Sequence, residues 1–109
     1  MSFSIKSIAV FERQANRLIK KYPSLKKELL LLINTLKENP AQGSGIGKSC
    51  YKIRISIASK GKGKSGGARI ITNIVIQQSI VYLMSIYDKS ERENLSYKDL
   101  EELLKSIPI

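Results

Sequence analysis

The sequence contains no histidine and only one cysteine, Cys50. One cysteine cannot form a disulfide within the chain, which is typical of proteins in a reducing cytosol. So few nitrogen and sulfur ligands all but exclude a zinc site. The chain also lacks a run of about 18 apolar residues, which excludes a membrane-spanning helix, and it lacks the pattern of a signal peptide. We therefore expect a cytoplasmic protein that needs no metal or other cofactor.

Acidic residues are missing from the middle of the chain, since none lies between Glu38 and Asp88. The formal net charge of the whole chain is +10. Seven of its cations lie in the acid-free part, namely Lys48, Lys52, Arg54, Lys60, Lys62, Lys64 and Arg69. Like charges at this density repel one another, so they indicate a polyanionic partner. The alternative is that the charge serves only to keep the protein in solution.

Apolar and polar residues alternate from Tyr51 to Ala58. This period of two predicts a half-buried strand, on which Lys52 and Arg54 lie on one face about 7 Å apart. The two cations either serve a site on the sheet or only solvate its face. A turn rich in glycine and lysine follows, and its Gly-x-Gly-x-x-Gly pattern matches a dinucleotide-binding loop. A strand and not a helix comes next, so dinucleotide binding is rejected.

The remaining patterns predict one α+β domain over residues 1–109. The expected elements are a strand at 2–7, helices at 8–22 and 24–38, strands at 51–58, 68–76 and 80–87, and a helix from 96. Pro23 ends the first helix and Ser24 is expected to cap the second, so the two helices form an antiparallel hairpin. The last strand is apolar on both faces and should be central. Ser96 and Asp99 form a capping box.

Expectations about burial and local structure also follow for residues outside the basic segment. Leu30 and Leu31 widen the apolar stripe of the second helix, which indicates either burial on two sides or a partner surface. Residues 41–47 are rich in glycine and serine and are expected to form a loop. Three further residues are expected to pack in the core, namely Cys50, Tyr51 and Tyr82.

Three segments carry a resemblance to a known family: Tyr51–Arg54, Lys60–Ile71 and Val81–Glu91. With them the chain resembles the RelE/ParE superfamily of bacterial toxins, in particular its HigB-like RelE branch, over nearly its whole length. The resemblance implies a fold related to small microbial ribonucleases, with a helical hairpin packed on a curved, mostly antiparallel sheet in the order β-α-α-β-β-β-α. It also implies the toxin of a type II toxin–antitoxin pair, an endoribonuclease that cuts messenger RNA, usually on the ribosome.

Cleavage of RNA by its own 2′-hydroxyl needs a base, cations for the charge on the phosphate, and an acid for the 5′ oxygen. Without histidine, the proton carriers must be Lys, Tyr, Glu or Asp. Lys52 is the candidate base, and Arg54 and Arg69 have the fork geometry that binds phosphate oxygens. Further candidates follow or end the last strand, namely Tyr87, Lys89 and Glu91. In the family pattern the catalytic cations fall on Lys52, Arg54, Arg69 and Lys89. We expect neither Lys52 nor Arg69 to belong to the core.

The other cations of the acid-free part are candidates for binding the RNA backbone, namely Lys48, Lys60, Lys62 and Lys64. We expect the turn that holds the last three to be mobile without RNA. The tyrosine that some RelE toxins use after the last strand has no clear equivalent, and Leu95 or Tyr97 lies nearest to its place.

The expected partners are a protein antitoxin, messenger RNA and the ribosome, with no membrane. The chain either forms a homodimer or joins the antitoxin in a hetero-oligomer. Two alternatives remain open: a ParE-like toxin that binds DNA gyrase, and a basic RNA-binding module without catalysis. Either alternative would leave RNA intact.

Overall fold

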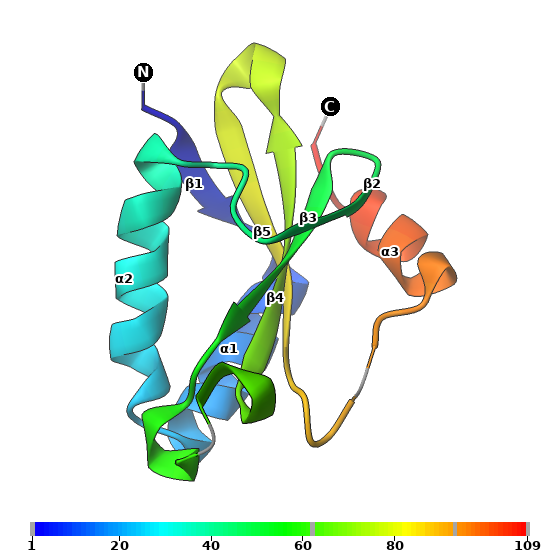
Figure 1. The fold of residues 1–109 in the computed structure, drawn as a ribbon. Coiled ribbons are helices and arrows are strands. Elements are labelled where there is room, and N and C mark those ends of the chain that lie inside the picture. Colours follow the sequence, from blue (N-terminus) through cyan, green and yellow to red (C-terminus); the bar gives the residue numbers. More distant parts are fainter. Residues whose placement is uncertain (1, 62, 93, 109) are drawn as a thin grey trace.

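The structure is a computed structural model that describes residues 2–61, 63–92 and 94–108. Its sheet has five strands in the order β1-β5-β4-β3-β2. The elements in chain order are β1 (Ser4–Ser7), α1 (Ala9–Lys21), α2 (Leu25–Glu38), β2 (Ser44–Gly47), β3 (Cys50–Ile55), η1 (Ala58–Lys60), η2 (Gly63–Gly66), β4 (Ala68–Val75), η3 (Ile76–Gln78), β5 (Ile80–Asp88) and α3 (Tyr97–Leu104) (Figure 1).

The sheet is mixed, because β1 runs parallel to β5 while all other neighbours are antiparallel. This arrangement confirms the α+β fold with a mostly antiparallel sheet. It also explains why β5 is apolar on both faces, since β5 lies inside the sheet between β1 and β4. The prediction of an interior position for this strand is confirmed.

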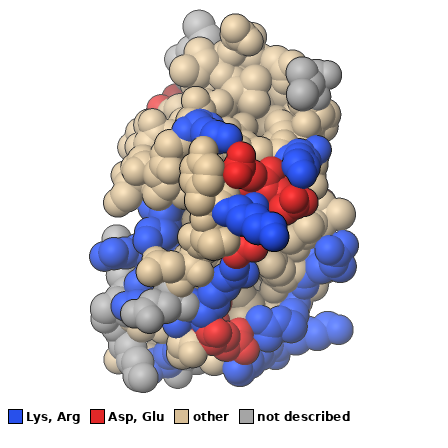
Figure 2. Space-filling model, turned by 90° about the vertical axis from the view of Figure 1, so that its right-hand side faces the viewer, with Lys and Arg blue, Asp and Glu red and all other residues tan. Residues whose placement is uncertain are grey.

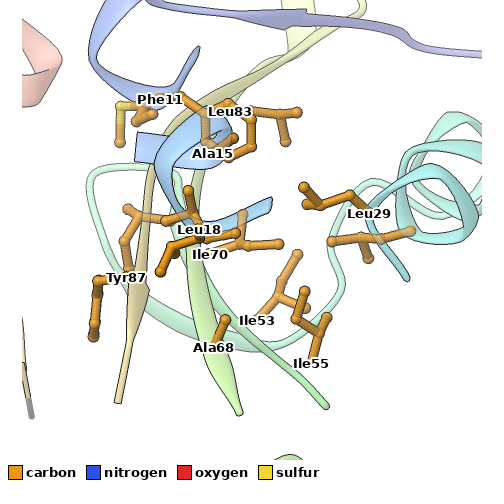
Figure 3. Close-up of a cluster of buried hydrophobic side chains, with 14 of the residues drawn as sticks. Phe11, Ala15, Leu18, Leu29, Ile53, Ile55, Ala68, Ile70, Leu83 and Tyr87 are labelled. Atoms are coloured by element: carbon orange, nitrogen blue, oxygen red, sulfur yellow. The ribbon is translucent and has the colours of Figure 1, made fainter. Parts of the chain in front are cut away.

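α1 and α2 pack on one face of the sheet and form the core with it. Figure 3 shows Phe11 and Ala15 of α1 close to Leu83 of β5, and Leu18 close to Ile70 of β4, with Leu29 of α2 to one side. Leu18 and Ile70 are completely buried. The helical periodicity in the sequence had placed the α1 and α2 residues of this cluster on the apolar stripes of the two helices. The core therefore lies between the helical hairpin and one face of the sheet.

Local structure departs from the sequence expectations in two turns. Residues 44–47, expected in a loop, form the short edge strand β2, which pairs with β3 through Ser44↔Lys52. A glycine is required just before it, because a Cβ at Gly43 would lie 2.3 Å from the Lys52 carbonyl oxygen. The strand expected at 51–58 ends at Ile55 as β3. The turn rich in glycine and lysine that follows contains the short 3-10 helices η1 and η2.

The helix termini give one wrong and one confirmed prediction. Ser24 has helical backbone angles and its side chain does not cap α2. The Ser96 hydroxyl accepts a bond from the Asp99 amide at 3.0 Å, and the Asp99 carboxylate accepts one from the Ser96 amide at 3.4 Å. The capping box that begins α3 is therefore present.

Two leucines of α2 face solvent, with Leu30 58% and Leu31 53% exposed. Burial on two sides was thus the wrong expectation, and the alternative of a partner surface stays a prediction. Cys50 and Tyr82 are buried, as expected, whereas Tyr51 is only partly buried. None of the described helices has the length and apolar character to cross a membrane.

Candidate active site

Three candidate residues form a row across the sheet. The strand register places Arg54 of β3 opposite Arg69 of β4, and Arg69 opposite Tyr87 of β5. Directly paired residues lie on the same face of a sheet, about 5 Å apart. The neighbouring row of Ile53, Ile70 and Ile86 faces the helical hairpin, so the row with the two arginines lies on the opposite face.

Burial within this row is uneven. Arg54 is exposed, whereas Arg69 is 3% and Tyr87 6% exposed. Burial lowers the pKa of the Arg69 guanidinium, and the charge of Arg54 lowers it further. The expectation that Arg69 lies outside the core is therefore wrong: its guanidinium lies within the sheet face, where one NH group donates to the Ala68 carbonyl at 3.2 Å.

Tyr87 presents a phenol without a partner. Its hydroxyl is buried and has no hydrogen bond within the part of the chain that the structure describes. Burial raises the pKa of Tyr87, while the charges of Arg69 and Arg92 lower it. The phenol therefore keeps its proton at neutral pH and has a free donor beside a row of guanidinium groups.

Lys52 lies next to this row on the same face of β3. Its amine is 3.5 Å from the Asn94 side-chain oxygen, and it lines a hollow of about 230 Å³ with Ile71, Leu95 and Tyr97. The segment after β5 thus folds back toward β3. Figure 2 shows the side of the molecule that carries α3, where lysines and arginines gather over the lower half.

Two residues at this site were missed by sequence reasoning, Arg92 and Asn94. Arg92 lies 6.0 Å from the ring centre of Tyr87, within cation–π range, and also contacts Asp99. Both residues belong to an irregular segment without periodicity. The only available signal was the position of Arg92 just beyond the Tyr-x-Lys-x-Glu motif.

The structure places two other candidates, Glu91 and Lys48, in ion pairs outside this row. Glu91 pairs with α1, with one oxygen 2.8 Å from Arg17 and the other 3.6 Å from Lys21, and the bond from Arg17 lowers its pKa. The Lys48 amine is 3.3 Å from Glu101 on α3. Lys89 is exposed, and its backbone amide donates to the Gly67 carbonyl at 3.1 Å.

Lys60 folds back onto the end of β5. Its amine is 2.7 Å from the carboxylate of the fully buried Asp88, and its side chain is only 12% exposed. It also lies 5.6 Å from the ring centre of Tyr22. This lysine holds the basic turn against the body of the protein. Lys62 and the side chain of Lys64 lie outside the part of the chain that the structure describes.

Comparisons with known proteins agree with this architecture. The E. coli toxin RelE, as a double arginine-to-alanine mutant in the free state, superposes with a TM-score of 0.63 at 18% identity, over 99% of this chain and 100% of that one. The same mutant in complex with a peptide of the antitoxin RelB gives 0.51 at 17% identity, with the same coverage.

A family model described as the RelE toxin of the RelE/RelB toxin–antitoxin system matches residues 8–107. The structural likeness supports the fold, and the family match spans nearly the whole chain, including every strand that forms the cationic row. On this ground the chain belongs to the RelE toxin family of RelE/RelB toxin–antitoxin systems.

Proposed function

We propose that this chain is an endoribonuclease toxin of the HigB-like branch, which cuts messenger RNA on the ribosome without a metal ion. The observation that carries the proposal is the row of Arg54, Arg69 and Tyr87, with Lys52 beside it, on the sheet face opposite the helical hairpin. A phosphate that enters this face meets two guanidinium groups, one lysine side chain and one phenol. These are the functional groups that a ribonuclease without histidine needs.

The proposed reaction transfers two protons. In it, the Lys52 amine takes the proton of the 2′-hydroxyl, whose oxygen then attacks the adjacent phosphorus. Arg54 and Arg69 bind the phosphate oxygens on which negative charge develops. The bond to the 5′ oxygen breaks, and this oxygen takes the proton of Tyr87, which leaves a 2′,3′-cyclic phosphate. Lys89 is a second candidate for the acid, since it directly follows β5.

Glu91 is the second candidate for the base. Its pairing with Arg17 and Lys21 favours Lys52 for this role. The two assignments predict different results for Lys52→Arg, because a guanidinium does not give up its proton at physiological pH. Loss of cleavage in this variant would support Lys52 as the base, and normal cleavage would point to Glu91.

The test is a translation reaction with purified protein, followed by mapping of messenger 5′ ends. The wild-type protein is expected to create new 5′ ends, and Lys52→Ala and Arg54→Ala are expected to lose roughly 100-fold in rate. Lys37→Ala, an exposed cation on α2, is the charge-matched control and should cut normally. Intact messages together with inhibition of gyrase supercoiling would overturn the proposal in favour of a ParE-like toxin. Intact messages that stay bound to the protein would favour a module without catalysis.

The proposed inhibitor of this activity is a protein antitoxin, which forms a hetero-oligomer with the toxin. In support, the similar E. coli RelE binds a peptide of RelB, and the acid-free part of this chain suits an acidic binding segment. If charge guides this association, added salt will weaken it. Co-expression with the product of the neighbouring gene, a small acidic or helix-turn-helix protein, would restore growth.

A further inference from the structure

A second row of paired residues lies next to the cationic row, on the other face of the sheet. The register pairs Ala68 of β4 with Ile55 on one side and with Asp88 on the other. Successive residues of a strand point to opposite faces, so this row faces the helical hairpin. Ile55 and Ala68 accordingly belong to the buried core cluster (Figure 3). The fully buried carboxylate of Asp88 thus lies behind the candidate active site, next in the chain to Tyr87.

One carboxylate oxygen of Asp88 connects two separate segments of the chain. It accepts a bond from the Lys60 amine at 2.7 Å, which belongs to the basic turn between β3 and β4. It also accepts bonds from the amide and the hydroxyl of Ser90, at 3.0 and 2.8 Å, in the segment after β5. The Lys60 amine donates to the Ser90 hydroxyl as well, at 3.2 Å. The three residues therefore form one closed cluster, the Asp88 cluster.

The backbone of Asp88 shapes the segment that follows β5. Its carbonyl accepts bonds from the amides of Glu91 and Arg92, each at 3.0 Å. Together with the bonds to the Asp88 side chain, these bonds close a tight turn at the end of the strand. The Arg92 guanidinium then lies 6.0 Å from the ring centre of Tyr87. The directions of Lys89 and Arg92, which come from this turn, therefore depend on how Asp88 is held.

The basic turn is attached to the sheet at two points. Lys60 attaches it to Asp88, and the Gly67 carbonyl attaches it to β5 by accepting the amide of Lys89 at 3.1 Å. At the second point a Cβ on Gly67 would lie 2.0 Å from the Ile55 carbonyl oxygen, so only glycine fits there. The two attachment points lie on either side of the remaining lysines of the turn in the sequence. Both cationic segments are thus fixed at the same end of β5.

We propose that Lys60 and Asp88 are positioning residues for RNA cleavage, whose ion pair holds the basic turn and the segment after β5 so that both border one phosphate site. Neither side chain touches the RNA, since Asp88 is buried behind the cationic row and the Lys60 side chain is only 12% exposed. The pair acts through the cations that it places. A displacement of about 1 Å in such groups can slow a reaction roughly 100-fold.

The inference rests on the proposed function, because it takes cleavage at the cationic row as the reaction. It also gives Lys60 a different role from the one expected from the sequence. A lysine that binds the RNA backbone would have to leave Asp88 when the RNA arrives, and its loss would weaken binding. A positioning lysine stays on Asp88, and its loss slows the chemical step in the bound state.

The experiment measures single-turnover cleavage on ribosomes with bound message, over a range of toxin concentrations, at a temperature where circular dichroism shows each variant folded. Lys60→Met and Asp88→Asn should each lower the rate at saturating toxin at least about tenfold, with less than about threefold change in the half-saturating concentration. Lys60→Arg, which keeps the charge opposite Asp88, should restore most of the rate. The control Lys105→Met breaks an exposed pair with Glu102 and should leave both values within about twofold.

The double variant of Lys60→Met with Asp88→Asn separates positioning from stability. Lys60→Met alone leaves a buried carboxylate unpaired, so the double variant should melt at a higher temperature than this single variant. Its saturating rate should stay as low as that of either single variant, because both substitutions act through one ion pair. A rate that recovers together with the melting temperature would overturn positioning and leave the pair a purely structural role.

Two further outcomes would also overturn the inference. A normal saturating rate for Lys60→Met, with a higher half-saturating concentration, would make Lys60 an RNA-binding residue. Amide chemical shifts of Lys89 and Arg92 that are the same in Lys60→Met and in the wild type would show that the pair does not position this segment. Wild-type cleavage with normal rates in both single variants would reject positioning and keep the nuclease, whereas no cleavage by the wild type would reject the nuclease itself.

Discussion

Arg69 is a candidate catalytic residue whose charge is buried in the sheet face. Its pKa is lowered by burial and by Arg54, so the folded protein disfavours the charged form. An apolar residue of similar length would avoid both the desolvation of this charge and its repulsion by Arg54. We expect Arg69→Met to cut messages about 100-fold more slowly while its melting temperature stays equal to that of the wild type or rises.

The control for this prediction is Arg54→Met at the exposed end of the same row. It should slow cleavage similarly and change the melting temperature less, because Arg54 is solvated. Calorimetry of both variants beside the cleavage assay is the measurement. A marked fall in the melting temperature of Arg69→Met alone would mean that its guanidinium stabilises the fold.

Asp88 is a second residue whose charge matters, and here the charge stabilises. Burial alone would raise its pKa, but bonds from Lys60, Ser90 and Tyr22 outweigh burial and lower the pKa to about 2 from 3.8. This difference corresponds to roughly 2 kcal/mol at neutral pH. Because the folded pKa is the lower one, the stabilisation is complete above about pH 4 and is lost as the pH falls toward 2.

We therefore expect Asp88→Asn to be less stable than the wild type by roughly 2 kcal/mol at pH 7. The difference should shrink steadily between about pH 4 and pH 2. Urea unfolding over this range measures it, with Glu91→Gln as the control, since exposed pairs contribute little. A stability difference that does not change with pH would mean that the amide disturbs packing and not an ion pair.

For individual residues, the sequence predicted those positions of the candidate site that a regular period determines. Alternation placed Lys52 and Arg54 on one face, and the register now adds Arg69 and Tyr87. The sequence pattern of the basic turn did not indicate which of its lysines pairs with Asp88. That choice depends on a buried carboxylate 28 residues away in the chain.

At the scale of elements, α3 depends on its N-terminus. The helix has eight residues, of which Leu100 is buried, and it begins with the capping box of Ser96 and Asp99. Loss of such a cap costs about 1 kcal/mol. We expect Ser96→Ala to lower the melting temperature by about 4–8 °C at most and to speed amide exchange first within α3. Exchange that rises equally in β4 and β5 would show that α3 does not open separately.

The elements found from the sequence are those with a clear period, namely the helices, β1 and β3 to β5. β2 was missed because Ser44–Gly47 combines two glycines with one apolar residue, a composition typical of loops. Its strand conformation comes from pairing with β3, which local propensity does not report. The 3-10 segments in the basic turn were missed for the same reason, since contacts with the sheet shape them.

At the scale of the whole molecule, the excess of positive charge should make RNA binding strongly dependent on salt. The logarithm of the affinity is expected to fall linearly with the logarithm of the salt concentration, by about 0.7 for each phosphate contacted. Lys62→Gln with Lys64→Gln should reduce this slope by about one to two and leave stability unchanged. Adding Lys60→Gln should lower the melting temperature, because it breaks the pair with Asp88. If the double variant has the same salt dependence of affinity as the wild type, Lys62 and Lys64 do not contact the RNA.

The parallel pairing of β1 with β5 also determines when the sheet can form during synthesis of the chain. Residues 4–7 leave the ribosome well before their partners, residues 80–83. The first strand must therefore wait for the last one, and the row from Arg54 to Tyr87 does not exist before β5 has emerged. If this row is the active site, the nascent chain cannot cleave RNA until β5 has emerged, and the antitoxin has that interval in which to bind.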